Sequence, residues 1–189
     1  MKILITGGCG FLGSNIASKY LKLEEEVIII DDLSREGSKK NLLWLKSISK
    51  SNNLHFYDID IKNKEDVNSV FLKHSNINYV CHLAGQVAMT KSIENPLRDF
   101  NTNALGTINV LEAIRNNHPN CFIAYSSTNK VYGDLEHLNK NENETRYFLP
   151  DFPNGLNENL PLDFSTPYGC SKGSADQYIK DYAKVFGLK

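Results

Sequence analysis

The chain has 189 residues, which suits one sizeable domain with its own core. Its 21 Lys and Arg residues nearly balance its 22 Asp and Glu residues, so the net charge of -1 gives no electrostatic reason to expect nucleic acid or a membrane as a partner. The sequence shows neither the apolar core of a signal peptide nor the ~20 apolar residues of a membrane span, so we expect a cytoplasmic protein.

Five apolar runs of strand length recur along the chain, with helical patterns between them. They cover residues 2–6, 26–31, 54–59, 78–84 and 121–127. Their apolar residues are continuous rather than alternating, which is typical of strands buried on both faces of a parallel sheet. The alternation of strands and helices predicts an α/β fold with a doubly wound parallel sheet of the Rossmann type.

Three of the intervening segments have helical periodicity. The apolar stripes consist of Leu12, Ile16 and Tyr20 in residues 11–24, of Val67, Val70 and Phe71 in residues 65–74, and of Ala104, Leu105, Ile108 and Leu111 in residues 104–117. We expect these stripes to face the sheet.

Residues 134–164 interrupt this pattern with a stretch rich in Asn, Glu and Pro. A loop of this length inside a compact domain is usually functional or disordered. We therefore predict one domain over residues 1–189, with 134–164 as an insertion on the substrate side. Ser165 or Thr166 then offers an N-cap for a last helix that ends near Gly187.

The cysteines and His82 do not form a metal-binding pattern. Cys9, Cys81, Cys121 and Cys170 lack CxxC spacing and a nearby set of histidines, so we expect free structural thiols and no metal site. His82 is expected to be a hydrogen-bonded structural residue.

Glycines directly after the first strand indicate a phosphate-binding turn. Gly7, Gly10 and Gly13 allow a tight turn, a close approach of the backbone to a pyrophosphate, and close helix packing. Asp31 ends the second strand, where a carboxylate can accept hydrogen bonds from the adenosine ribose and repel a 2'-phosphate. This favours NAD over NADP, although Arg35 nearby offers a guanidinium that can pair with such a phosphate.

Tyr168 and Lys172 lie four residues apart at the start of the last predicted helix, and so on one face of it. A nearby ammonium stabilises a phenolate, which turns a weak base into a usable one. Ser126, Ser127 and Thr128 end the fifth predicted strand, at the sheet edge where such folds bind ligands.

Seven segments in this order resemble the nucleotide-sugar epimerase/dehydratase branch of the extended short-chain dehydrogenases/reductases, over essentially the whole chain. They read TGGCGFLG, DDLS, DIKN, HLAG, NALGTINVLEA, SSTNKVYG and YGCSK. A tyrosine and a lysine at this spacing often occur by chance, but the ordered set of segments is highly specific. The resemblance implies an NAD-dependent enzyme of nucleotide-sugar metabolism.

The resemblance also implies roles for individual residues. The catalytic residues would be Tyr168, Lys172 and Thr128. The cofactor-binding residues would be Gly7, Gly10, Phe11, Leu12, Gly13, Asp31, Asp32, Ser34, Asp60, Ile61, Leu83, Ala84, Gly85, Asn103, Ser126, Ser127 and Lys172, with Asp60 and Ile61 flanking the adenine. The substrate-binding residues would be Gln86, Thr128, Asn129 and Tyr168.

One departure from the family pattern narrows the implied reaction. Family dehydratases carry an Asp-Glu pair directly after the threonine, whereas Asn129 and Lys130 stand there in this sequence. The resemblance then favours an isomerase that inverts C2 of a CDP-linked 3,6-dideoxyhexose by transient oxidation, as in O-antigen biosynthesis of lipopolysaccharide. Another epimerase of the UDP-hexose 4-epimerase type, a reductase, and a non-catalytic dinucleotide-binding module remain as alternatives.

Family members continue into a sixth strand and a smaller substrate domain, which this chain largely lacks. The resemblance implies a homo-oligomer that takes a CDP-hexose as its substrate. Arg146 and Tyr147, within the insertion, are candidates to meet the phosphates or the base of that substrate.

Overall fold

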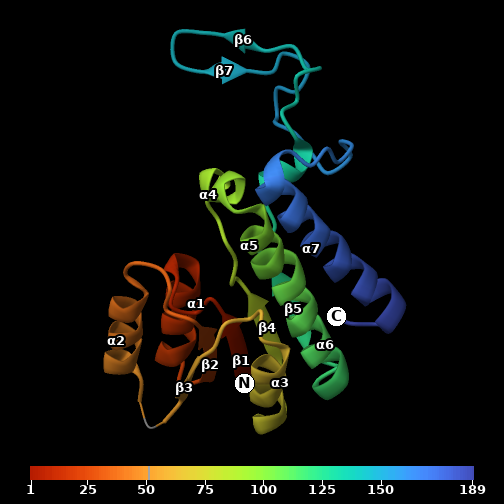
Figure 1. Cartoon of the computed structure of the whole chain (residues 1–189). Helices are drawn as coiled ribbons and strands as arrows, with labels where there is room; N and C mark the ends of the chain where they lie inside the picture. The colour runs from red at the N-terminus through yellow and green to blue at the C-terminus, as the bar shows by residue number, and fades with distance from the viewer. Residues whose placement is uncertain (51) are drawn as a thin grey trace.

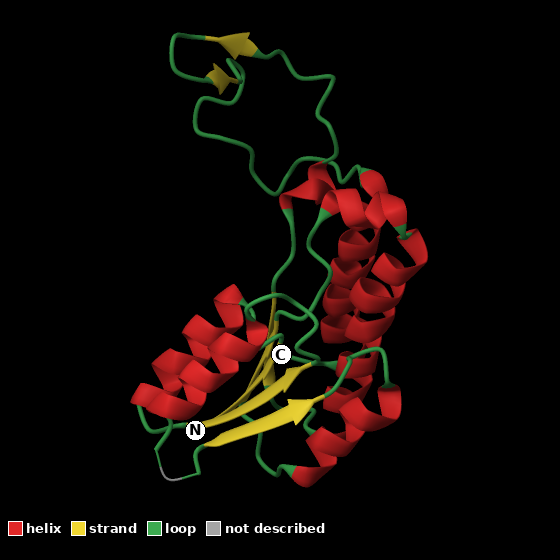
Figure 2. Cartoon of the chain, turned by 60° about the vertical axis from the view of Figure 1, so that its left-hand side comes forward, coloured by secondary structure: helices red, strands yellow, loops and turns green. Residues whose placement is uncertain are grey.

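A five-stranded parallel sheet forms the centre of the computed structural model, which describes residues 1–50 and 52–189. The strand order is β3-β2-β1-β4-β5, and helices cover both faces (Figures 1 and 2). The strands are β1 (Lys2–Thr6), β2 (Glu26–Asp31), β3 (Leu54–Asp58), β4 (Tyr79–His82) and β5 (Phe122–Tyr125). The predicted doubly wound sheet is confirmed, with each strand within the range that the apolar runs indicated.

The helices alternate with the strands along the chain. They are α1 (Phe11–Lys22), α2 (Ser38–Ile48), α3 (Lys64–Lys73), α4 (Met89–Glu94), α5 (Pro96–Phe100), the π-helical turn η1 (Asn101–Leu105), α6 (Gly106–Asn117), the 3-10 turn η2 (Asn129–Tyr132) and α7 (Thr166–Phe186). Across residues 1–50 and 52–189, none of these helices is long and apolar enough to cross a membrane. The four cysteines are free thiols, as predicted.

Successive side chains of the central strands pack alternately into two separate cores, one on each face of the sheet, which explains the continuous apolar runs. Ile3 and Ile5 of β1 pack with α1 and α2 on one face of the sheet. Leu4, between them, packs with α3 and α6 on the other face. Burial on both faces therefore requires an apolar residue at every position of the middle of β1, and the same holds for β2 from Val27 to Ile30.

The predicted stripe of α1 is confirmed in part, since Ile16 and Tyr20 are half-buried and pack against the core. Leu12 is 56% exposed, whereas Gly13, Ala17 and Leu21 are buried. Small residues let the start of the helix approach the glycine turn closely, so the first turn of α1 buries Gly13 and leaves Leu12 exposed. Leu105 is likewise exposed, in the π-helical turn that precedes α6.

β1 and β4 are neighbours in the sheet, but the chain leaves them toward opposite faces. α1 follows β1 on the face with α2, whereas the connection after β4 leads to α6 on the face with α3. Sheets of this kind bind ligands at the carboxyl ends of the two strands where this reversal occurs. A ligand site is therefore expected at the loops after Thr6 and His82.

The insertion extends away from the body of the molecule beyond α4 and the start of α7 (Figures 1 and 2). It carries a two-stranded antiparallel ladder of β6 (Asn141–Glu142) and β7 (Tyr147–Phe148). Its two ends lie together, because Asp163 N donates to Val131 O at 2.9 Å and Ser165 Oγ donates to Asp134 Oδ2 at 3.2 Å.

Candidate active site

The turn after β1 packs so closely that only glycine fits at two of its positions. Gly7 has a φ of +70°, and a Cβ added there would lie 2.7 Å from Ala84 N. A Cβ on Gly13 would lie 2.2 Å from Gly7 O. Gly7 N donates to Ile30 O at 2.8 Å, which fixes the turn between the ends of β2 and β4.

The N-terminus of α1 emerges from this turn with its amide groups available. Gly10 is the N-cap and, within the described chain, no side chain caps the helix and no acidic residue lies in its first turn. Unsatisfied N–H groups and the positive end of the helix dipole favour a phosphate at such a terminus. The residues present thus fit the pyrophosphate of a dinucleotide.

Asp31, at the end of β2, joins the glycine turn to its own loop. Its Oδ2 accepts from Cys9 N and its Oδ1 accepts from Leu33 N, each at 2.9 Å. Burial raises the pKa of Asp31, and the two backbone hydrogen bonds oppose that rise. Each carboxylate oxygen retains a lone pair that a ribose hydroxyl can approach.

The other predicted adenosine-side residues lie at the carboxyl ends of β2 and β3. Asp32 is exposed and its Oδ1 accepts from both Ser34 N and Ser34 Oγ. Asp60 forms an ion pair with Lys62 at 3.1 Å. The side chain of Ile61 is 4% exposed and belongs to the core, so only its backbone remains available to flank an adenine. Phe11 and Leu12, by contrast, are exposed at the start of α1.

The loop after β4 is held by Asn103 of η1. Gln86 N donates to Asn103 Oδ1 at 2.8 Å, and a Cβ added to Gly85 would lie 2.9 Å from the same oxygen. Leu83 and Ala84 precede this contact and are half-buried. The Gln86 amide bonds to Ala88 and to Asp99, so it is already engaged within the protein instead of being free for a substrate.

His82 forms part of a buried chain of hydrogen bonds. Thr107 Oγ1 donates its single hydrogen to Asn103 O, so it must accept from His82 Nε2, 2.9 Å away. His82 Nδ1 then accepts from Thr6 Oγ1 at 2.6 Å. Burial lowers the pKa of His82 to about 3, and the Lys172 ammonium contributes to this fall. His82 is thus a neutral structural residue, as predicted.

Lys172 is buried although it carries an ammonium group. It is 6% exposed, its Nζ donates to Ser126 O at 2.6 Å, and Nζ lies 4.1 Å from the centre of the Tyr125 ring. Burial lowers the pKa of Lys172 to about 8, while the carboxylates of Asp176 and Asp99 oppose that fall. Lys172 therefore places a positive charge at the carboxyl end of β5.

Tyr168 lies one helical turn before Lys172 and is half-buried. Its hydroxyl makes no hydrogen bond to any described residue, so it is available to a ligand. The adjacent Gly169 packs on η2, since a Cβ there would lie 3.1 Å from Lys130 O. Thr128 is the N-cap of η2, so this packing brings the turns that carry Tyr168 and Thr128 together.

The hydroxyl of Thr128 accepts from Lys130 N at 3.3 Å and keeps its own hydrogen to donate. Ser126 is half-buried and contributes its carbonyl to Lys172, whereas Ser127 and Asn129 are exposed beside it. The predicted hydroxyl-bearing segment thus lies directly against the start of α7.

The sequence patterns missed Asp99 and Ser171. Asp99 is buried in α5, and its Oδ2 accepts from Ser171 Oγ of α7. These residues lie 72 positions apart, and although Ser171 stands within the YGCSK segment, nothing in the sequence links it to Asp99. Only the fold brings them together.

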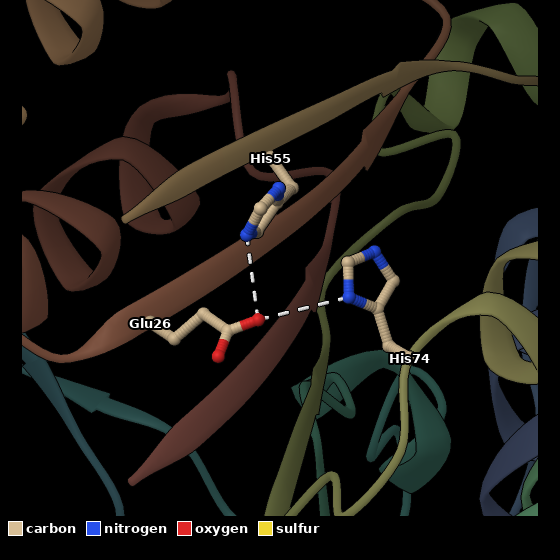
Figure 3. A group of neighbouring side chains, drawn as sticks. All are labelled: Glu26, His55 and His74. Carbon is tan, nitrogen blue, oxygen red and sulfur yellow. Dashed lines mark ion pairs between the residues drawn. The ribbon is translucent and has the colours of Figure 1, made fainter. Parts of the chain in front are cut away.

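A second polar cluster lies away from this site, where β2 and β3 begin. Glu26 Oε1 is 3.3 Å from His55 Nε2 and 3.7 Å from His74 Nδ1 (Figure 3). These residue types can bind a metal ion. Lys2 Nζ, however, lies 3.0 Å from the same oxygen of Glu26, so an ammonium already neutralises the carboxylate. The cluster is therefore an ion-paired group.

Comparisons with known proteins place this chain in a family. A family model described as GDP-mannose 4,6 dehydratase matches residues 4–189. The chain is 56% identical over 188 residues to CDP-paratose 2-epimerase of Salmonella typhi, covering 100% of this chain and 54% of the relative. It is 34% identical over 197 residues to dTDP-glucose 4,6-dehydratase of Salmonella typhimurium, covering 100% of this chain and 52% of the relative.

Among solved structures, UDP-glucose 4-epimerase of Thermus thermophilus in complex with NAD superposes with a TM-score of 0.76 at 29% sequence identity. The match covers 100% of this chain and 53% of that one. The chain thus spans about half the length of the relatives that it matches.

Proposed function

Because the chain belongs to the GDP-mannose 4,6 dehydratase family, we propose that it is the cofactor-binding portion of an NAD-dependent nucleotide-sugar epimerase. The proposed reaction converts CDP-paratose to CDP-tyvelose by inversion at C2 of the sugar. The single observation that supports it most is the 56% identity to CDP-paratose 2-epimerase over 100% of the chain.

The proposed chemistry begins with the transfer of a proton from the sugar to Tyr168 Oη. As the base, Tyr168 Oη takes the proton of a sugar hydroxyl, with the buried ammonium of Lys172 one turn away on the same helix. The Thr128 hydroxyl can donate a hydrogen bond to the oxygen of that sugar hydroxyl. NAD, which the glycine turn and Asp31 would hold, would supply the hydride acceptor and donor for this chemistry.

Inversion requires the oxidised sugar to present its other face before the hydride returns. Tyr168, now protonated, gives its proton back to the carbonyl oxygen in the reverse step. The reaction therefore regenerates both the cofactor and the base, and its net redox change is zero.

Asn129 and Lys130 support epimerisation over dehydration. Elimination of water needs an acid and a base beside the sugar, and the family dehydratases implied by the resemblance place Asp and Glu at these two positions. A neutral amide and an ammonium cannot supply a pair of carboxylates. The similarity to a dTDP-glucose 4,6-dehydratase therefore supports a shared fold and cofactor more than a shared reaction.

The most direct test incubates the full-length protein with CDP-paratose and NAD and follows the configuration at C2 by NMR. We expect inversion at C2 without net formation of NADH. No inversion at C2, with turnover of UDP-glucose instead, would show that the enzyme is a 4-epimerase and overturn the proposed substrate.

Tyr168→Phe tests the assigned base in the same protein. Removal of one hydroxyl should lower kcat by about 10²-fold or more, while the affinity for NAD, measured by calorimetry, stays within a few-fold of wild type. Tyr178→Phe, on an exposed part of the same helix, is the matched control. If Tyr168→Phe keeps most of the activity, another group is the base.

We also propose NAD, rather than NADP, as the cofactor. Asp31 places a carboxylate where an adenosine ribose would lie, and a 2'-phosphate there would be repelled. Arg35, Lys39 and Lys40 line the surface just beyond it and work in the opposite direction. Binding titrations with both cofactors decide between these effects, and tighter binding of NADP would overturn the assignment.

Residues 1–189 are proposed to form the NAD-binding domain, with residues 134–164 as a loop on the substrate side. A homo-oligomer is proposed as well. Exposed apolar side chains on α5 and α7 support it, because such surfaces are commonly covered by a further protein surface. They are Leu97, Phe100, Tyr178, Val185 and Phe186.

A further inference from the structure

Asp99 is a buried carboxylate that no cation of the described chain pairs with directly. It is 1% exposed, and no Lys, Arg or His side chain in residues 1–50 and 52–189 forms an ion pair with it. Burial of a carboxylate is unfavourable unless hydrogen bonds and a compensating charge offset it. The hydrogen bonds and the compensating charge of Asp99 both come from residues of the candidate active site.

The carboxylate of Asp99 collects hydrogen bonds from three separate segments. Its Oδ1 accepts from Gln86 Nε2, in the loop after β4, at 2.9 Å. Its Oδ2 accepts from Ser171 Oγ of α7, and Asn103 Nδ2 of η1 lies 3.5 Å from the same oxygen. Asn103 Nδ2 also donates to Ser171 Oγ at 2.9 Å, which closes the network.

This network joins the two halves of the candidate active site. Ser171 directly precedes Lys172 and lies one turn after Tyr168, whose carbonyl is 3.1 Å from Ser171 Oγ. Gln86 follows residues 83–85, the loop expected to line the nicotinamide ribose. Asp99 thus connects the helix that carries the acid/base pair to the loop that would hold the cofactor.

We propose that Asp99 is a positioning residue for the Tyr168–Lys172 pair, an inference that rests on the proposed function of this site. Through Ser171 and Gln86 it holds the first turns of α7 against the loop after β4. Because Asp99 bonds to Ser171, the residue next to Lys172, its negative charge also lies near the buried ammonium, whose other neighbours include the Ser126 carbonyl and the Tyr125 ring.

The described residues place five charged or titratable groups around Lys172. They are Asp99 of α5, Asp176 and Tyr168 of α7, His82 of β4 and Tyr125 of β5. His82 is neutral, and burial raises the pKa of Tyr125, so neither offsets the ammonium. Among these five groups, the two carboxylates favour the charged form of Lys172, and Asp99 is the buried one of the two.

Asp99→Asn removes the charge and reverses the hydrogen bond to Ser171, but it leaves Gln86 and Ser171 each with a hydrogen-bond partner. The oxygen of the new amide would accept from Gln86, and its nitrogen would donate to Ser171 Oγ. Ser171 would then turn its hydrogen to Tyr168 O, which it already approaches at 3.1 Å. Replacement of a buried charge by a neutral group of the same shape is often neutral or stabilising, so we expect the variant to fold.

The test measures kcat, KM and the thermal midpoint of full-length Asp99→Asn from pH 6 to pH 10. We expect kcat to fall roughly tenfold, because the reversed and uncharged bond to Ser171 holds the first turn of α7 less firmly. We also expect the alkaline limb of kcat to move to lower pH, because Lys172 loses its proton more easily without the carboxylate. The thermal midpoint should not fall. An unchanged pH profile, or a loss of activity that only follows a loss of stability, would overturn the proposal.

Two further variants separate positioning from simple charge. Asp176→Asn also removes a carboxylate near Lys172 but leaves the Ser171 network intact, so it should move the alkaline limb without lowering kcat at its plateau. Asp181→Asn, at an exposed position of the same helix, is the matched control and should change neither quantity.

A readout without turnover tests the electrostatic link independently of the proposed reaction. If the full-length protein epimerises no nucleotide sugar, an NMR titration of the side-chain Cε and Nζ nuclei of Lys172 still applies. A titration midpoint lowered by about half a pH unit or more in Asp99→Asn supports the link. An unchanged midpoint contradicts it.

Discussion

His82 shows how a single residue ties the stability of the sheet to pH. Its ring is 0% exposed and lies between Thr6 of β1 and Thr107 of α6. With Nε2 donating and Nδ1 accepting, the neutral ring satisfies both neighbours. A second ring proton would face a donor and would add a charge beside Lys172.

The pH dependence of unfolding follows from this. The pKa of His82 is about 3 in the folded chain and near its ordinary value of 6.5 in the unfolded chain, so between these values the unfolded state binds the extra proton. The stability that His82 contributes is therefore complete above pH 6.5 and decreases as the pH falls toward 3. Over this range each pH unit removes roughly 1.4 kcal/mol from the free energy of unfolding.

Urea unfolding of the wild-type protein and of His82→Gln, from pH 8 to pH 4, measures this contribution. The two curves should converge as the pH falls, because only the wild type has His82 to protonate. His137→Gln, at an exposed position, should run parallel to the wild type. Parallel curves for His82→Gln would contradict the prediction.

The residues of the candidate site fall into two groups according to what the sequence revealed. Gly13, Asp31, Tyr168 and Lys172 stand at recognisable positions in short motifs, although Asp31 and Lys172 also bond to residues far away in sequence. Asp99 acts only through residues of other segments, and a lone aspartate in a short helix gives no pattern to read. Its role depends on the fold being known.

The position of helix α1 depends on close packing of Gly13 against the backbone of the glycine turn. A Cβ on Gly13 would lie 2.2 Å from Gly7 O, and that oxygen cannot move without shifting the turn. Gly13→Ala should therefore push α1 away from β1, with a loss of about 1–3 kcal/mol in the free energy of unfolding and a marked loss of NAD affinity.

Gly10→Ala provides the comparison, since a Cβ there would meet only Gly7 O, at 3.2 Å. Its effect on chemical denaturation should be clearly smaller than that of Gly13→Ala. Equal losses of stability in the two variants would mean that the packing of Gly13 against Gly7 O is not the cause of the loss.

The helices and strands that the sequence predicted are those with a single dominant burial pattern. β1 and β2 are buried on both faces and α3 buries Val67, Val70 and Phe71, so their apolar residues stand out. The sequence patterns missed α2 because its buried side chains, Leu42 and Leu45, stand among exposed apolar and charged residues. They missed the short α4 and α5 because several of the contacts that hold them are polar and distant in sequence.

The insertion stands apart from the two cores that hold the rest of the molecule together. Among the described residues, neither core cluster includes a member of 134–164. The two ends of the insertion are nevertheless joined, and a Cβ on Gly133 would lie 2.5 Å from Asp163 O. Folding of the body and the shape of this loop should therefore be separable.

Replacement of residues 135–161 by three glycines tests this separation. We expect the thermal midpoint to change by less than about 5 °C and the NAD affinity to stay within a few-fold. KM for the nucleotide sugar should rise roughly tenfold or more, equivalent to about 1.4 kcal/mol of lost binding.

Arg146→Ala and Tyr147→Ala, made separately in the intact loop, show whether individual side chains account for that rise. A shortened protein that binds the nucleotide sugar as tightly as wild type would assign the loop to another task.

The two hydrogen bonds of the Asp31 carboxylate bear on how the cofactor preference can evolve. A neutral residue at this position would no longer repel a 2'-phosphate, but with at most one acceptor oxygen it would lose the bond to Cys9 N or to Leu33 N and so loosen the glycine turn. A lineage that exchanges NAD for NADP would first need a substitution that anchors this turn by other means. The same order of changes applies to laboratory redesign, where a library varied at position 31 alone should yield mostly weaker binders of both cofactors.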